Sequence, residues 1–210
     1  MPIKAPEQTV YIIDDDAAVL DSLDVWLRAS GLKTRTWSDP QHFLEGYQRD
    51  WCGCLVLDIQ MPAISGLGLQ EELVAVGSTL PIIFMTGHGS ISTAVQAMKA
   101  GAFEFIEKPF AHDVMFGHIR RAFELDAQKR EAMGQQQQIR ARLETLTPRE
   151  AEVLDYVLDG KATKVIALEL SLSQRTVEIY RANIMQKMQS RSVAQLVKIL
   201  SAFRAGSQLQ

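Results

Sequence analysis

Apolar positions in the first 125 residues follow two alternating patterns, and this alternation predicts the fold class. Short continuous apolar runs such as Val10–Ile13 and Cys54–Leu57 are typical of strands buried on both faces of a parallel sheet. Between them lie segments with apolar residues three and four positions apart, as in Ala17–Ser30, which is typical of helices. The pattern therefore predicts an α/β fold with a five-stranded, doubly wound parallel sheet.

The boundaries of these elements are marked by turn and capping residues. Gly31 and Gly101 follow predicted helices, and Asp39 with Pro40 is a typical helix start. We expect strands at 10–13, 33–37, 54–57, 80–85 and 103–106, and helices at 17–30, from 40, at 67–76, at 90–100 and from 114.

Residues 145–210 show only the helical pattern. Thr147–Glu150 forms a capping box with proline at the first helical position, and Ser192–Gln195 opens another helix. Between them, a helix at 163–170 is followed by a three-residue turn and a helix that Ser173 caps. Two helices joined in this way form a helix-turn-helix, so a small all-α domain is predicted.

The segment between the two parts contains no proline and is rich in Gln, Arg, Glu and Ala, which favours a helix. Apolar residues are scarce from Asp126 to Gln138, so the helix is expected to be exposed there. A low-complexity linker and a dimerising coiled coil are the alternatives. We therefore expect an α/β domain at 1–125, a long helical linker at 126–144 and the helical domain at 145–210.

Charge differs between the two domains. Residues 1–125 hold 9 Lys and Arg against 16 Asp and Glu, whereas residues 145–210 hold 9 against 6. A basic domain favours a polyanionic partner. No apolar run approaches the roughly 18 residues that a membrane span needs, and the amino terminus lacks a signal pattern. A cytoplasmic protein without a membrane partner is expected.

The two cysteines, Cys52 and Cys54, lie two residues apart at the start of a predicted strand. This spacing does not suit an unstrained disulfide, and a metal site would need histidine or further cysteine nearby. Small buried core residues are the expected role.

Charged and polar side chains follow the predicted strands at the edge where open parallel sheets bind ligands. Asp14 and Asp15 follow the first strand and Asp58 the third, so their charges would repel one another unless a cation lies among them. Thr86 and Lys108 follow the fourth and fifth strands. Oxygen ligands favour Mg²⁺ (or Mn²⁺), which often completes its shell with phosphoryl oxygens. This constellation predicts a carboxylate nucleophile that attacks phosphorus.

Each of these residues also has an ordinary structural interpretation. Asp14 to Asp16 could cap the following helix, a role expected above all of Asp16. Lys108 could be a surface lysine, and Thr86 before Gly87 could belong to a simple turn. Their arrangement at four strand ends in one repeating pattern favours the functional interpretation.

The set Asp14-Asp15, Asp58, Thr86 and Lys108-Pro109 resembles the signature of the response-regulator receiver domain. The resemblance implies that Asp58 accepts a phosphoryl group from a sensor histidine kinase. It implies that Asp15, Asp58 and the backbone carbonyl of Gln60 hold Mg²⁺, with Asp14 acting through water, and that Thr86 and Phe105 form a switch.

The segments 83–89 and 97–102 resemble the FixJ-like subgroup of these proteins. The loop after Asp58 departs from that subgroup, because Gln60, Ala63 and Ser65 stand where it often has Arg, Gly and Asp. These departures bear on the lifetime of the phosphorylated state.

Residues 146–150 and 172–185 resemble the LuxR/FixJ-type DNA-binding domain, although a helical bundle with solvated charges would share its general pattern. The resemblance implies that the third helix of the domain enters the major groove. Base-facing positions map onto Glu178, Ile179 and Ala182; the other predicted contacts and their neighbours are Gln174, Arg175, Thr176, Tyr180, Arg181 and Lys187.

Together, these resemblances predict a phosphorylation-controlled transcription factor of a two-component system. We expect a homodimer when phosphorylated, a two-fold operator in double-stranded DNA, and RNA polymerase as a further partner. Enzymatic activity is expected only as self-phosphorylation from small phosphodonors and autodephosphorylation. The alternatives are a phosphotransfer enzyme that uses an aspartyl-phosphate and a constitutive DNA-binding regulator whose receiver does not switch.

Overall fold

A computed structural model describes residues 7–87 and 91–207, with side chains described as far as Arg204. The chain divides into two compact units, Met1–Arg130 and Glu131–Gln210, here called the first and the second unit. None of the described helices has the length and apolar character needed to cross a lipid bilayer.

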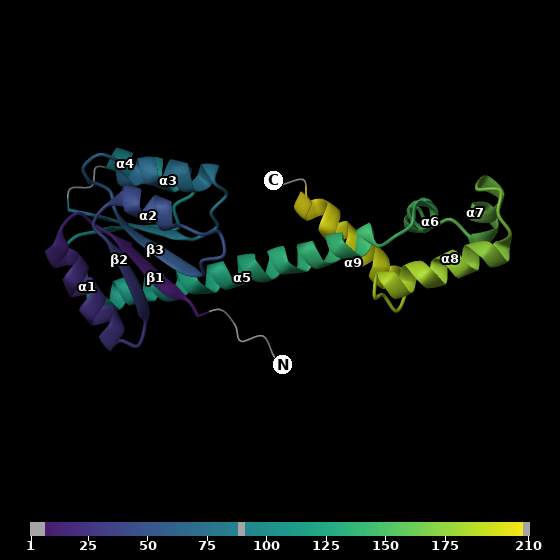
Figure 1. Ribbon diagram of the computed structural model, residues 1–210, viewed down its shortest axis with the longest axis horizontal. Coiled ribbons are helices and arrows are strands. Elements are labelled where there is room, and N and C mark those ends of the chain that lie inside the picture. The colour runs from purple at the N-terminus through teal and green to yellow at the C-terminus, as the bar shows by residue number, and fades with distance from the viewer. Residues whose placement is uncertain (1–6, 88–90, 208–210) are drawn as a thin grey trace. The chain divides into compact units, whose positions relative to one another are not determined.

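The first unit alternates strands and helices, as Figure 1 shows. The parallel sheet has the strand order β2-β1-β3-β4-β5, which confirms the predicted doubly wound fold. Its elements are β1 (Thr9–Ile13), α1 (Ala17–Ala29), β2 (Lys33–Trp37), α2 (Pro40–Gly46), β3 (Gly53–Asp58), α3 (Gly66–Ala75), β4 (Ile82–Thr86), α4 (Ile91–Lys99), β5 (Glu104–Glu107) and α5 (His112–Glu144). The predicted start of the fourth helix at Ser90 lies outside the described residues.

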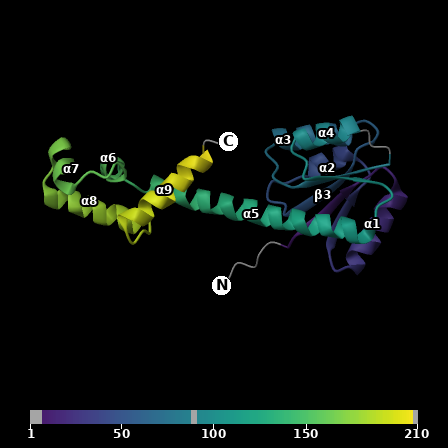
Figure 2. The ribbon, with the colours of Figure 1, turned by 180° about the vertical axis from the view of Figure 1, so that it is seen from behind.

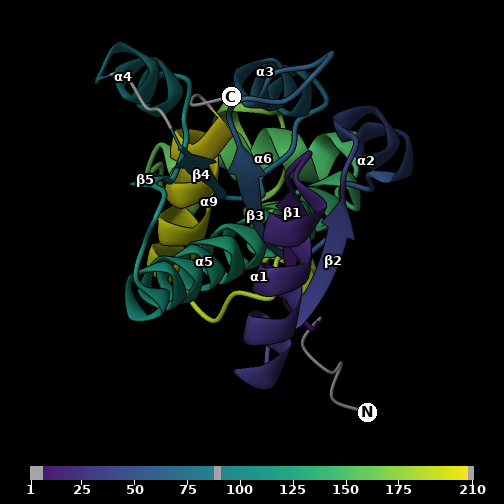
Figure 3. The same ribbon diagram turned by 90° about the vertical axis from the view of Figure 1, so that its left-hand side faces the viewer.

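Helices cover both faces of the sheet. Seen end-on in Figure 3, α2, α3 and α4 lie on one face and α1 and α5 on the other. The central strand β3 is buried along its whole length, which explains its unbroken apolar sequence. Separate clusters of buried side chains fill the two sides, one around Phe43 and Phe84 and the other around Leu27 and Ile119.

Helix α5 is continuous from His112 to Glu144 (Figures 1 and 2). In the first unit its buried residues are Met115, Ile119, Ala122 and Asp126. In the second unit, Ile139 and Leu143 pack against the core. Most residues from Glu131 to Gln138 are exposed. The predicted helical linker is therefore confirmed as a helix, but Asp126 was expected to be exposed and is fully buried.

The second unit consists of the end of α5 and four further helices: α6 (Pro148–Leu158), α7 (Thr163–Glu169), α8 (Gln174–Lys187) and α9 (Val193–Ser207). The predicted capping box is present, since the Thr147 side chain accepts from the Glu150 amide and the Glu150 carboxylate accepts from the Thr147 amide. Ser173 caps α8 through the amide of Thr176. The α7–turn–α8 pair forms the predicted helix-turn-helix.

Candidate functional site

The carboxyl edge of the sheet gathers two buried carboxylates around one ammonium group. Asp14 follows β1, Asp58 ends β3, and Lys108 follows β5. Lys108 Nζ donates to Asp14 Oδ2 at 2.6 Å and to Asp58 Oδ1 at 2.8 Å. The predicted pairing of Lys108 with Asp58 is confirmed, and the bond to Asp14 is an addition to it. We call these three residues the acidic cluster.

Local turns orient both carboxylates. The Asp16 amide donates to Asp14 Oδ1 at 3.0 Å, and the Gln60 amide donates to Asp58 Oδ2 at 2.6 Å. Only 1% of Asp14 and 6% of Asp58 is exposed, whereas Asp15 is exposed. The side chain of Asp16 caps α1, as predicted. Charged groups held in such fixed geometry need little rearrangement before they react.

Burial and pairing act in opposite directions on the charges of the cluster. Burial raises the pKa of Asp14, and the hydrogen bonds from Lys108 and the Asp16 amide only partly offset this effect. Burial alone would lower the pKa of Lys108, but hydrogen bonds to Asp14 and Asp58 outweigh it and raise that pKa. Lys108 therefore remains a firmly protonated cation at neutral pH.

The donor atoms at this edge suit a hard divalent cation. In the described part of the chain, no group of three or more His, Cys, Asp or Glu side chains is arranged to hold a metal ion. Mg²⁺, however, commonly takes only one or two carboxylates and completes its shell with waters and phosphate oxygens. Asp14 and Asp58 supply two such carboxylates, whereas roles for the exposed Asp15 and for the carbonyl of Gln60 stay predictions.

The loop after Asp58 depends on close backbone packing. The Gly66 amide donates to the Ile59 carbonyl at 2.9 Å. A Cβ atom at Gly66 would lie 2.3 Å from the carbonyl oxygen of Asp58, so only glycine fits there. Ala63 in the same loop has a φ of 66°, a left-handed conformation that disfavours residues with a Cβ. The departure from glycine noted in the sequence thus places a strained residue in the loop that follows Asp58.

Replacing Ala63 with Gly is expected to raise the free energy of unfolding of the first unit by about 1 kcal/mol, because glycine relieves the left-handed strain. Urea unfolding followed by tryptophan fluorescence measures this, since Trp26, Trp37 and Trp51 all lie in the first unit. The matched control is Ala127→Gly at an exposed helical position, which should lower stability by a similar amount. A destabilised Ala63→Gly protein would contradict the prediction.

Thr86 and Phe105 lie on the neighbouring strands. Thr86, the last residue of β4, is 1% exposed, and its carbonyl accepts from the Lys108 amide at 2.7 Å. Phe105 of β5 is half-buried and stands opposite Phe84 in the strand register. Thr86 ends the strand next to β3, which carries Asp58, and Phe105 lies in β5, the strand that precedes Lys108. Their role as a switch stays a prediction.

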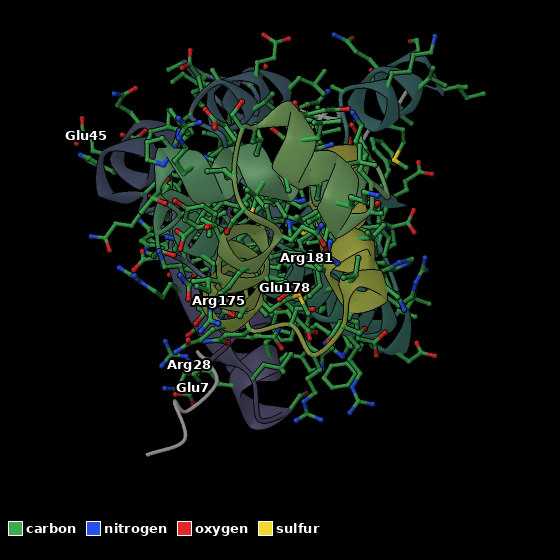
Figure 4. The ribbon with its side chains drawn as sticks, turned by 90° about the vertical axis from the view of Figure 1, so that its right-hand side faces the viewer. Glu7, Arg28, Glu45, Arg175, Glu178 and Arg181 are labelled. Carbon is green, nitrogen blue, oxygen red and sulfur yellow. The ribbon has the colours of Figure 1, made fainter. Side chains whose placement is uncertain are left out.

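Helix α8 presents most of the predicted DNA contacts at its surface. Gln174, Arg175, Glu178, Ile179 and Ala182 are exposed, while Thr176, Tyr180 and Arg181 are partly buried. In Figure 4, Glu178 lies between Arg175 and Arg181 on this helix. Ile179 is 53% exposed, and an exposed apolar side chain on such a helix suits a thymine methyl group.

Lys187, at the end of α8, is held by partners within the second unit. Its Nζ donates to Glu150 Oε2 at 2.6 Å and to the Thr145 carbonyl at 2.9 Å. Only 4% of the Glu150 side chain is exposed. These bonds hold Lys187 within the second unit, and its place among the DNA contacts stays a prediction.

The Glu150–Lys187 pair predicts a pH-dependent stability of the second unit. The hydrogen bonds from Lys187 and Thr147 lower the pKa of Glu150 to about 2. Because the folded pKa lies below the unfolded one, the stabilisation is complete above about pH 5 and is lost as the pH falls toward 2. Glu150→Gln is expected to cost about 2 kcal/mol at pH 6 and almost nothing at pH 2. Urea unfolding followed by circular dichroism tests this; an equal loss at both pH values would contradict it.

Sequence reasoning missed the environment of Asp126. Its carboxylate is fully buried and accepts hydrogen bonds from the Gly53 amide at 2.9 Å and from Cys52 Sγ at 3.2 Å. Arg130 pairs with the same carboxylate from the next turn of α5. The spacing of Met115, Ile119, Ala122 and Asp126 on one face was the available signal, but an aspartate in that series was interpreted as the start of an exposed segment.

Comparison with protein families matches both units. Residues 10–120 match the response regulator receiver domain, and residues 144–200 match the bacterial regulatory proteins of the luxR family. The chain is 44% identical to the response regulator protein TmoT of Ectopseudomonas mendocina, covering 92% of this chain and 88% of that protein. It is 43% identical to the transcriptional regulatory protein FixJ of Bradyrhizobium diazoefficiens, covering 94% and 95%.

Solved structures of whole response regulators are also similar. The response regulator StyR shares 41% identity with a TM-score of 0.87, covering 93% of this chain and 98% of StyR. Full-length FixJ from B. japonicum shares 39% identity with a TM-score of 0.57, covering 95% and 98%.

Proposed function

Because the chain belongs to the two-component response regulators that join a receiver domain to a LuxR-type DNA-binding domain, we propose that phosphorylation of Asp58 controls its binding to DNA. The phosphoryl group comes from a sensor histidine kinase. Phosphorylation promotes dimerisation and sequence-specific binding. The acidic cluster carries the proposal, because Lys108 bridges Asp14 and Asp58 at the edge where a phosphoryl group would arrive.

The reaction at Asp58 is a nucleophilic displacement at phosphorus. A carboxylate oxygen of Asp58 forms the new P–O bond while the P–N bond of the phosphohistidine donor breaks, and the leaving nitrogen keeps the electron pair. Mg²⁺ or Mn²⁺, held by Asp14, Asp15, Asp58 and the Gln60 carbonyl, would neutralise charge on the phosphoryl oxygens. Lys108 already lies 2.8 Å from Asp58 and can transfer a hydrogen bond to the new phosphoryl group.

The new phosphoryl oxygens also give Thr86 a hydrogen-bond acceptor, and its inward movement leaves space for Phe105. The adjacent surface of α4 is apolar: Ile91, Val95 and Met98 are 85%, 45% and 44% exposed and share one helical face by their spacing. We infer that phosphorylation makes this surface dimerise, so that two α8 helices address a two-fold operator. RNA polymerase would then contact the bound dimer.

The alternatives have less support. A phosphotransfer enzyme would require a second carboxylate two residues after Asp58, and this position is Gln60. A constitutive regulator would not need the ion pairs that Lys108 makes with both aspartates. Footprinting on genomic fragments, with and without a phosphodonor and Mg²⁺, distinguishes them, since only the proposed function predicts protection that depends on both additions.

Arg175→Ala is expected to weaken binding to all DNA sequences about equally, because a guanidinium contact with phosphate carries no sequence information. The slope of log affinity against log salt concentration should fall by about one, which corresponds to one lost phosphate contact. Arg191→Ala removes the same charge from an exposed position outside α8 and serves as the control. Fluorescence anisotropy over a range of salt concentrations measures both variants. Equal salt slopes for Arg175→Ala and the wild type would contradict the contact.

A further inference from the structure

The amino end of β3 holds a second buried ion pair, at the opposite end of the strand from Asp58. Asp126 of α5 is fully buried, and Arg130 Nε lies 3.0 and 3.1 Å from its two carboxylate oxygens. A buried carboxylate is costly unless it is paired and hydrogen-bonded, and Asp126 meets both conditions.

Asp126 also accepts a hydrogen bond from a backbone amide that does not take part in the pairing of the sheet strands. Gly53, the first residue of β3, has a φ of 133°, and a Cβ there would lie 1.9 Å from the Thr9 carbonyl oxygen. Its amide donates to Asp126 instead of to a neighbouring strand. The Cys52 thiol donates a hydrogen bond to the same carboxylate. Burial, and to a smaller extent this hydrogen bond, raises the pKa of the thiol to about 11. A residue of α5 is thereby fixed to the strand that carries Asp58.

We propose that Asp126 is a positioning residue that anchors α5 on the amino end of β3, and that this anchor is required for phosphorylation at Asp58 to change DNA affinity. β3 is a short strand buried throughout, with Asp58 at one end and the anchor at the other. While the anchor holds α5, rearrangement at the phosphorylated end is restricted to the elements around β4, α4 and β5. The inference rests on the function proposed above.

The test uses the full-length protein with Asp126→Asn and Arg130→Gln. Matched controls are Glu124→Gln and Lys129→Gln, which make the same changes at exposed positions of α5. Acetyl phosphate serves as the phosphodonor. Three quantities are measured: the rate of phosphorylation, the rate of Cys52 labelling by N-ethylmaleimide with Cys54 as internal reference, and the increase in DNA affinity on phosphorylation.

Both anchor variants are expected to be phosphorylated at the wild-type rate, because Asp58 lies at the far end of the strand. Labelling of Cys52, but not of the fully buried Cys54, is expected to accelerate at least about tenfold as α5 opens locally. Arg130→Gln is the decisive variant for this readout, because it keeps the Asp126 carboxylate that raises the thiol pKa. The increase in DNA affinity is expected to fall at least about fivefold. Arg130→Lys should restore part of the effect, because an ammonium group can still pair with Asp126.

Three results would overturn the proposal. Unchanged Cys52 labelling would show that the ion pair does not hold α5. Faster labelling with an undiminished gain in DNA affinity would show that the anchor is not needed for the response. A third result is that both Asp126→Asn and Arg130→Gln lose phosphorylation and become labelled at Cys54. This result would show that Asp126 is needed for the folding of the whole first unit. Failure of the proposed function itself is recognised separately, because the wild type would then show no gain.

Discussion

Asp58→Asn is expected to abolish formation of the phosphoprotein, the largest effect predicted for any single substitution in this chain. Asparagine keeps the size of the side chain and can still accept from the Gln60 amide, which now bonds Asp58 Oδ2 at 2.6 Å. It lacks the anionic oxygen that would attack phosphorus. Incorporation of acid-labile phosphate from acetyl phosphate, followed by phosphate-affinity electrophoresis, measures the effect.

Two controls separate loss of the nucleophile from loss of the site. Asp50→Asn removes one carboxylate from an exposed position of the first unit and should leave labelling unchanged. A chelator should suppress labelling of the wild type, and Asp15→Ala should reduce it nearly as strongly, because the metal neutralises the phosphoryl oxygens. Labelling of Asp58→Asn at the wild-type rate would refute the assignment, and undiminished labelling in chelator would remove the metal from the mechanism.

The sequence predicts the first unit well because local and tertiary signals agree there. β3 is buried on both faces, so its apolar run could hardly belong to another element. The capping residues Asp16 and Asp39 are each predicted from short-range patterns and are found as N-caps, and the same holds for Thr147 in the second unit. The carboxyl ends of parallel strands lie at the same edge of the sheet. The sequence therefore predicts that Lys108 and Asp58 lie close together, although they are far apart in the chain.

Interactions that depend on tertiary geometry without a local pattern were not predictable. Lys187 pairs with Glu150 across 37 positions of sequence, and Asp126 reaches Gly53 across 73. Nothing in the residues near Lys187 distinguishes its charge from a solvated one on a helix surface. For Asp126 the apolar spacing of Met115, Ile119 and Ala122 was a signal, but it did not reveal the partners of the carboxylate. A buried charge becomes recognisable only when its partners are brought close to it by the fold.

Thr86→Ala is expected to uncouple phosphorylation from dimerisation. Alanine removes the hydroxyl that would bond the phosphoryl oxygens, while Asp58 and Lys108 keep the chemistry of phosphorylation. The variant should therefore accept phosphate but remain monomeric. Sedimentation velocity of the wild type and Thr86→Ala, each with and without a phosphodonor, measures the effect; Val95→Asp on the exposed face of α4 tests the same surface directly.

Dimerisation matters for DNA binding because each α8 helix alone offers only a few contacts. Two such helices about one DNA turn apart on a two-fold site reinforce each other, and the gain in affinity is expected to be roughly 10²-fold or more. The phosphorylated wild type should accordingly sediment as a dimer and bind DNA tightly, whereas phosphorylated Thr86→Ala and Val95→Asp should do neither. A wild type that stays monomeric when phosphorylated, yet still gains DNA affinity, would exclude dimerisation as the mechanism and favour release of a DNA-binding domain that the unphosphorylated protein masks.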